Sequence, residues 1–197
     1  MRPVARLAGR LTGRGRSVSV RPADNRAFAG SSTILERNCF ISFRLSGHRF
    51  ALALTVVREV APFCTLARPP ACPPVLEGVL NLAGQAIPVL RLDRLLALSE
   101  ITPHISSCLL IVEEMKGRLA LLVDEVTGIE ELNGDQLLPV SAAATFNGCV
   151  IAQSQSGGEP LSVLSLERLM VRRERETIFH FASYEQQRAR LLTGTAQ

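Results

Sequence analysis

The feature that most constrains the fold is a hairpin pattern that occurs twice. Residues 39–54, "CFISFRLSGHRFALAL", alternate in polarity on both sides of a polar step at 46–48, which predicts two strands joined by a tight turn. A shift of 69 residues leads to "CLLIVEEMKGRLALLV" at 108–123, where Leu121 matches Leu52. The chain is therefore predicted to contain two related halves.

A second pair of segments supports the repeat. The sequence "VLRLDRLL" at 89–96 recurs as "VLSLERLM" at 163–170, so each half should contain a strand that leads into a short helix near Asp93 or Glu167. Short apolar strands also look alike by chance, and that alternative stays open. Many short strands without long helices between them favour an all-β fold in which each half closes into a small barrel and so removes its exposed strand edges.

The segment "EGVLNLAGQAIPVL" at 77–90 is interrupted by residues that shape the backbone. Gly78 and Gly84 permit turns, and Pro88 fits the start of a strand at an edge or barrel corner. We expect an exposed corner between the two glycines. It would present apolar side chains to a partner unless they point into the core: Val79, Leu80 and Leu82.

Size and composition indicate a soluble cytoplasmic chain with one domain, or two small domains that share a core. The 197 residues suffice for a sizeable core, and charged residues, Gly or Pro interrupt each apolar run before about 18 residues, the length of a membrane span. The five cysteines form no C-x-x-C pair, which argues against a disulfide framework and a zinc site. We expect them to act as small buried apolar residues in a reducing compartment.

The positive charge of the chain is concentrated near its N-terminus. Residues 1–35 hold seven arginines and one acidic residue, a balance of +6, so the net charge of +4 leaves −2 for residues 36–197. Because this arm is also poor in apolar residues, we expect it to be disordered. An unstructured extension is the favoured interpretation, with a contact to nucleic acid or an anionic surface, or a transit peptide, as alternatives.

The C-terminal segment is charged and predicts a short helix. Ser183 and Gln186 have the spacing of a capping box, and three residues could form an apolar stripe: Tyr184, Leu191 and Leu192. We expect this segment to be a solvated tail rather than a docking element.

The sequence lacks a recognisable catalytic constellation. Its three histidines, His48, His104 and His180, belong to no motif with a nucleophile, and no Walker loop, G-x-S-x-G elbow or H-E-x-x-H motif is present. Asp124 and Glu125 are better interpreted as a solvated strand end than as a carboxylate pair. We therefore predict a protein that is not an enzyme and uses no cofactor or metal.

The segment "EGVLNLAGQAIPVLRL" resembles the G-V/I-x-N-L-R-G signature and following P-V-x-x-L strand of the CheW-like family. Residues 39–60 resemble the family's first hairpin and its V-x-E-V exit, and "RLALLVDEVTGIEELNGDQLLP" is similar to its L-L-V-D-x-V segment. The resemblance covers about residues 38–171. It implies two SH3-like five-stranded β-barrel subdomains around a shared core, with short helices and a C-terminal helix.

The resemblance also implies a non-catalytic adaptor that couples chemoreceptors to a CheA-type histidine kinase. The expected partners are the kinase regulatory domain and the cytoplasmic tips of chemoreceptors, with recruitment to membrane-bound receptor arrays and no membrane insertion. Where the family has Arg, this chain has Ala83, and Arg58 beside Glu59 could supply part of that charge. A nucleic-acid or anionic-surface binder acting through the arm is the alternative function.

These interpretations give a division of the chain and a set of partner-binding residues. We expect a disordered extension at 1–36, a CheW-like domain at 37–172 and a charged, partly helical tail at 173–197. The predicted partner-binding residues are Arg58, Glu59, Val79, Asn81, Leu82, Ala83, Gly84 and Gln85.

Overall fold

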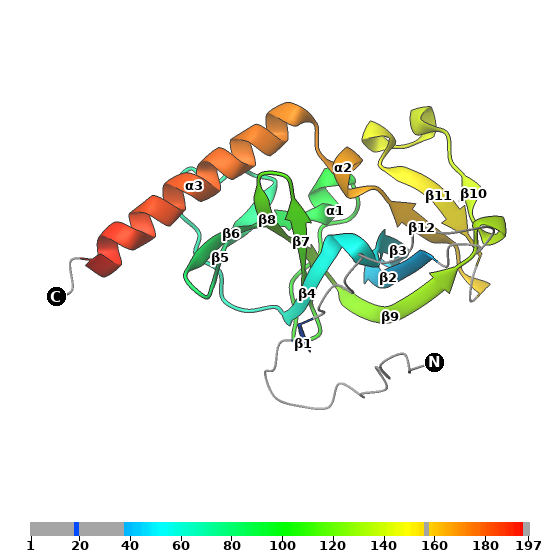
Figure 1. Cartoon of the computed structure of the whole chain (residues 1–197), viewed down its shortest axis with the longest axis horizontal. Coiled ribbons are helices and arrows are strands. Elements are labelled where there is room, and N and C mark those ends of the chain that lie inside the picture. Colours follow the sequence, from blue (N-terminus) through cyan, green and yellow to red (C-terminus); the bar gives the residue numbers. More distant parts are fainter. Residues whose placement is uncertain (1–17, 20–37, 156–157, 195–197) are drawn as a thin grey trace, which may run out of the picture.

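The computed structural model describes residues 18–19, 38–155 and 158–194 (Figure 1). The predicted disorder of the N-terminal arm, and any nucleic-acid contact through it, fall mostly outside these residues. The described part of the arm is β1 (Val18–Ser19), which pairs antiparallel with β4 (Val57–Pro62).

Both predicted hairpins are confirmed. The first consists of β2 (Asn38–Leu45) and β3 (His48–Ala53), and the second consists of β7 (Cys108–Glu114) and β8 (Gly117–Val123). In the first turn, residues 46–47 have φ values of 50° and 80°. Two successive positive φ values are typical of the two-residue turns that match the twist of antiparallel strands.

The second repeated segment is also confirmed as a strand that leads into a short helix. In the first copy, β6 (Gln85–Arg91) is followed by α1 (Leu92–Leu95). In the second copy, β12 (Leu161–Leu164) is followed by α2 (Leu166–Leu169).

The strands of the described residues form two six-stranded sheets, in the orders β1-β4-β7-β8-β6-β5 and β10-β11-β12-β3-β2-β9. The remaining strands are β5 (Leu76–Leu82), β9 (Glu125–Leu132), β10 (Leu138–Pro139) and β11 (Val150–Ser154). In the part of the chain that the structure describes, four 3₁₀ turns occupy connections: Leu54–Val56, Gly134–Gln136, Ala142–Ala144 and Phe146–Gly148. Without the two-residue strands β1 and β10, each sheet has the five strands expected of an SH3-like unit, and the predicted fold class is confirmed.

The expectation that each half closes its own barrel is wrong, because the halves exchange hairpins. The first-half hairpin β2–β3 lies between β9 and β12, and the second-half hairpin β7–β8 lies between β4 and β6. Two parallel pairings join the halves, β6 with β8 and β12 with β3. Polarity patterns reveal which residues face a core, but they do not reveal which distant strand lies alongside.

The two sheets share one main hydrophobic core. It includes fully buried side chains from both hairpins, among them Phe43, Leu52, Leu110 and Leu121, together with Ile178 from the C-terminal helix. A smaller cluster of buried residues lies within the second sheet: Phe40, Ala51, Leu132, Ala152, Leu161 and Val163. Because each sheet contributes to the main core, the two units are packed together as one body.

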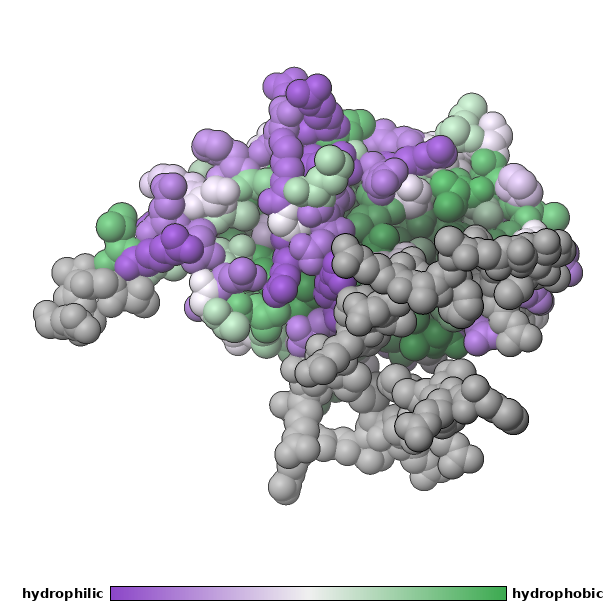
Figure 2. All heavy atoms as spheres, in the orientation of Figure 1, coloured by the Kyte–Doolittle hydropathy of each residue, from purple (hydrophilic) through white to green (hydrophobic). Residues whose placement is uncertain are grey.

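The C-terminal helix α3 (Arg172–Gly194) is longer than predicted and packs on the strands of the first sheet (Figure 1). It begins at Arg172, where the Val171 N–H donates to Glu174 Oε2 at 3.0 Å. The predicted capping box is wrong, because Ser183 lies inside the helix and its Oγ donates to the carbonyl of Phe179 at 2.9 Å. Figure 2 shows hydrophilic side chains gathered over α3 and the β7–β8 hairpin.

Candidate partner-binding surface

The β5–β6 turn, residues 81–85, is an exposed reversal with a left-handed backbone. Ala83 and Gly84 have φ values of 49° and 81°, and Leu82 pairs with Gln85 across the turn. Asn81 Oδ1 accepts a hydrogen bond from the Gly84 N–H at 3.0 Å. Gly84 therefore has the positive φ that its sequence context suggested, and the Asn81 side chain stabilises the turn from within.

Gly78 does not belong to this turn, contrary to the expectation of a corner that begins there. It is buried in β5, and a Cβ at this position would lie 2.6 Å from the carbonyl oxygen of Ala67. The backbone of Ala67 bonds Val79 in both directions, at 2.8 and 3.0 Å. Gly78 is thus required for the close approach of another chain segment and not for a change of direction.

The apolar residues of β5 point mainly into the protein. Val79 and Leu80 are only 6% and 7% exposed, and Leu82 is half-buried, so the alternative of core packing holds for the first two. Pro88 lies within β6 opposite Val79 and not at a strand start. The surface that the turn offers to a partner therefore consists mainly of Asn81 and residues 83–85, all of which are exposed.

Helix α3 docks directly on this turn, so the expectation of a solvated tail is wrong. Gln186 Oε1 accepts from the Ala86 N–H at 2.6 Å, and Gln186 Nε2 donates to the Gly84 carbonyl at 2.9 Å. Near its start, α3 is held by an ion pair of 2.9 Å between Arg175 Nε and Glu114 Oε2 on the β7–β8 hairpin. The helix is consequently part of the surface around the turn.

Arg58 and Glu59 lie on β4, which three strands of the first sheet separate from β5 in the sheet order. Arg58 Nε forms an ion pair with Glu113 Oε2 at 3.1 Å, so its charge is already balanced by a neighbour on β7. Glu59 is half-buried and lies opposite Ile111 in the sheet. The structure therefore brings residues 81–85 together at one turn and places Arg58 and Glu59 on a separate strand.

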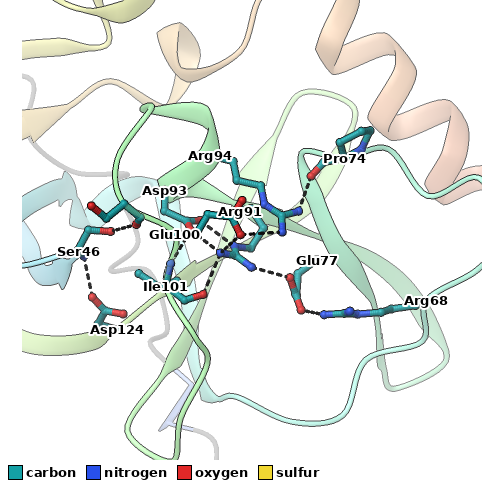
Figure 3. Close-up of polar contacts among 11 residues, drawn as sticks. Ser46, Arg68, Pro74, Glu77, Arg91, Asp93, Arg94, Glu100, Ile101 and Asp124 are labelled. Carbon is teal, nitrogen blue, oxygen red and sulfur yellow. Dashed lines mark hydrogen bonds and ion pairs between the residues drawn. The ribbon is translucent and has the colours of Figure 1, made fainter.

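A buried charge network connects β5, β6 and α1 (Figure 3). Arg91 and Asp93 are 3% and 0% exposed, and Arg91 Nε donates to Asp93 Oδ1 at 2.8 Å. Arg91 Nη1 donates to Glu77 Oε2 at 3.0 Å, and Glu77 also pairs with Arg68. Sequence reasoning missed this network, although the charged residues of "VLRLDRLL" stand within an otherwise apolar segment.

The network keeps the Asp93 carboxyl group ionised. Burial alone would raise the pKa of Asp93, but hydrogen bonds from Arg91 and from the Ile101 N–H, the latter at 2.9 Å, lower that pKa below its ordinary value. The hydrogen bond to Asp93 in turn raises the pKa of Arg91, because it also favours the charged form of the arginine. Both groups are therefore charged at neutral pH, and the pair connects β6 to the loop at Ile101.

A shallow hollow of about 190 Å³ lies beside this network. Its lining residues come from the segment before β5, from β5 itself and from α1: Arg68, Cys72, Pro73, Pro74, Leu76, Glu77 and Arg94. The charged groups in its wall are already engaged, since Arg94 Nη1 donates to the Pro74 carbonyl at 2.7 Å and Arg68 pairs with Glu77. The hollow is therefore a shallow surface depression whose charged side chains already have partners within the protein.

The predicted acidic step at the end of β8 has a structural use. Asp124 Oδ2 accepts from the Ser46 N–H at 2.7 Å, and Glu125 forms an ion pair of 3.6 Å with Arg44 (Figure 3 shows the first contact). Asp124 thereby joins the two hairpins. Within residues 18–19, 38–155 and 158–194, no group of three His, Cys, Asp or Glu side chains lies close enough together to hold a metal ion.

The cysteines follow the expectation of burial only in part. Cys149 is buried, Cys39, Cys72 and Cys108 are half-buried, and Cys64 is exposed, which contradicts its predicted burial. Burial raises the pKa of the Cys72, Cys108 and Cys149 thiols. Those three side chains are therefore protonated and weakly nucleophilic at neutral pH.

Comparison with known proteins identifies the architecture. A family model described as the CheW-like domain matches residues 40–174, which extend from Phe40 in β2 to beyond β12. The crystal structure of the scaffolding protein TtCheW from Thermoanaerobacter tengcongensis is similar with a TM-score of 0.65 at 20% identity, over 74% of this chain and 96% of that one. This structural likeness shows a shared fold.

Two curated proteins are similar in sequence. The probable chemotaxis protein CheW of Rhizobium etli is 25% identical over 99 residues, which cover 50% of this chain and 64% of that protein. The chemotaxis protein CheW of Rhizobium meliloti is 24% identical over 105 residues, covering 53% of this chain and 68% of that protein. This chain therefore spans a little under two thirds of the first relative's length. No helix in the described part of the chain is long and apolar enough to cross a membrane.

Proposed function

The chain belongs to the family of CheW-like domains, and from this premise we propose that it is a non-catalytic chemotaxis adaptor that couples chemoreceptors to a CheA-type histidine kinase. The observation that carries the proposal is the family match over residues 40–174, which includes both five-stranded units and the exchanged hairpins. Adaptor proteins need two partner surfaces on a stable body, and a shared core provides such a body.

We assign the receptor contact to the β5–β6 turn. Asn81 and residues 83–85 are exposed there, and Leu82 is half-buried at the base of the turn. Val79 supports the surface from the core, since it is 6% exposed. With Ala83 in place of the family's Arg, the turn offers no cationic side chain of its own, so receptor binding should be weaker than in relatives that carry Arg.

We assign the kinase contact to the surface around Arg58 and Glu59 on β4, a strand that β7, β8 and β6 separate from β5 in the sheet order. These two residues are half-buried, and Arg58 is paired with Glu113 at 3.1 Å. A partner that replaces this ion pair loses little, because the two side chains are still 37% and 43% exposed and such pairs contribute only about 0.2 to 1 kcal/mol in water. The adaptor would act in the cytoplasm, recruited to receptor arrays without inserting into the membrane.

The test is titration of the full chain, and of Ala83→Arg, against a receptor cytoplasmic tail and a CheA-type regulatory domain from the same genome. The proposal expects the natural chain to bind both partners and Ala83→Arg to bind the receptor tail more tightly with unchanged kinase binding. Absence of binding to both partners would overturn the adaptor function. Unaltered or weaker receptor binding by Ala83→Arg would overturn the assignment of the β5–β6 turn.

A further inference from the structure

The β5–β6 turn is held by side chains from two different elements. Asn81, at the end of β5, binds the Gly84 N–H at 3.0 Å. Gln186 of α3 binds two further backbone groups, the Gly84 carbonyl at 2.9 Å and the Ala86 N–H at 2.6 Å. A single amide side chain that both donates to and accepts from one backbone segment fixes its position and its orientation.

The backbone of the turn has a conformation that needs such support. Ala83 has a φ of 49°, a left-handed value that side chains with a Cβ adopt only at an energetic cost. Such conformations persist where the surrounding contacts determine them. The Gln186 amide is a contact of this kind, because it restrains the residues immediately after Ala83.

The base of Gln186 is itself rigid. Ile178, Phe179 and Ala182 on the same helix are 1%, 8% and 6% exposed, and the first two belong to the main core. The ion pair of Arg175 with Glu114 fixes the start of the helix on the β7–β8 hairpin. Gln186 therefore reaches the turn from a fixed position, one helical turn beyond the last of these buried apolar residues.

We propose that Gln186 is a positioning residue for partner binding, which acts by holding the β5–β6 turn in its binding conformation. The inference rests on the proposed function, in which this turn contacts the receptor. On this proposal α3 contributes to the receptor-binding surface. Gln186, which lies outside the turn, affects receptor binding but not kinase binding.

The chain offers a matched control in the adjacent residue. Gln187 has the same side chain but is exposed, and it points about 100° further around the helix than half-buried Gln186. Replacing either glutamine with alanine makes the same chemical change in the same helix. A difference between the two variants therefore reports on the contact with the turn and not on helix propensity.

The experiment compares the full chain with Gln186→Ala, Gln186→Glu and Gln187→Ala. Titration against the receptor tail and the kinase regulatory domain gives affinities, and amide hydrogen exchange by NMR follows the Ala86 N–H. We expect Gln186→Ala to weaken receptor binding about tenfold, as the loss of two hydrogen bonds suggests, and to accelerate exchange at Ala86. Gln186→Glu can accept from Ala86 but cannot donate to the Gly84 carbonyl, so its affinity should be intermediate. Kinase binding, and both affinities of Gln187→Ala, should stay unchanged.

The outcomes separate this inference from the proposed function. If the natural chain binds neither partner, the proposed function fails, and the inference fails with it. If the natural chain binds both partners and Gln186→Ala retains full receptor affinity while Ala86 exchanges faster, the turn has loosened without consequence and the inference alone is overturned. Equal losses for Gln186→Ala and Gln187→Ala, or an equal loss of kinase binding, would also overturn it.

Discussion

The two copies of the strand–helix segment share a backbone arrangement but differ in what they bury. In the first copy the Arg91 N–H donates to the Val75 carbonyl, and in the second copy the Ser165 N–H donates to the Cys149 carbonyl, each at 2.8 Å. Donor and acceptor of the second bond each lie 74 residues after their counterparts in the first. Yet Arg91 and Asp93 are buried, whereas Ser165 is half-buried and Glu167 is exposed. The two copies therefore share their main-chain hydrogen bond, whereas only the first copy contains the buried charge network.

The strand before each copy shows the same relation. The pairing of β5 shifts register between Leu76 and Gly78, and that of β11 shifts between Val150 and Ala152, again 74 residues further along. The first bulge has a glycine because the backbone of Ala67 crosses it closely, and the second bulge accepts an alanine. The first unit is thus braced on the segment around Ala67, next to the proposed receptor turn.

The largest expected difference between the copies concerns Arg91. Arg91→Ala leaves Asp93 and Glu77 buried without this partner, and breaking a buried pair in this way costs about 3 to 5 kcal/mol. The matched change Ser165→Ala should cost less than about 1 kcal/mol, since Ser165 is half-buried. Denaturant unfolding measures both, and similar losses would contradict the asymmetry.

The same network should make stability depend on acidity. Because the pKa of Asp93 is lower in the folded protein than its ordinary value of 3.8, its stabilisation is present above about pH 4 and is lost as the pH falls through the folded pKa. Asp93→Asn should therefore flatten the fall in unfolding free energy below pH 4, when it is measured by urea titration at several pH values. An unfolding free energy of Asp93→Asn that falls below pH 4 as steeply as that of the natural chain would contradict this prediction.

The two bulges should differ in their tolerance of a methyl group. Gly78→Ala places a Cβ 2.6 Å from the Ala67 carbonyl oxygen and should destabilise by about 1 to 3 kcal/mol. Ala152→Gly in the second copy should cost about 1 kcal/mol or less, mainly through backbone entropy. Thermal unfolding compares the two, and an unchanged melting temperature for Gly78→Ala would show that the Ala67 segment yields easily.

The smallest difference concerns the arginines that follow each strand. Arg94 Nη1 donates to the Pro74 carbonyl at 2.7 Å, and Arg168 Nη1 donates to the Gly148 carbonyl at 3.5 Å. Arg94→Ala should cost about 1 kcal/mol and Arg168→Ala less than about 0.5 kcal/mol, because the longer bond is weak. The reverse order in chemical unfolding would mean that the two anchoring bonds differ in ways that their lengths do not reveal.

Local patterns predicted much of this molecule. Both hairpins and both strand–helix segments follow from the alternation of apolar residues, because each is a local structure. The hairpin exchange was missed, since it depends on which distant strand pairs with Val89 or Leu161. The sequence of β6 or of β12 alone does not indicate whether the strand pairs with a hairpin of its own half or of the other half.

The candidate surface could be predicted from the sequence only where its features are local. Positive φ at Gly84 follows from its sequence context, whereas the role of Gly78 depends on Ala67 from an irregular segment. The start of α3 was misplaced because the Ser183 signal resembled a cap, while Glu174 caps the helix. The docking of Gln186 on the turn joins residues about 100 positions apart, which is a tertiary contact without a local signal.

The central claim, that this chain is an adaptor, is tested most directly by simultaneous binding. The kinase regulatory domain is titrated into a preformed complex of the full chain with the receptor tail, and the mass of the resulting species is measured by light scattering. The account predicts a ternary complex, with a kinase affinity close to that of the chain alone. Displacement of the receptor tail by the kinase domain, or failure to form either binary complex, would contradict it.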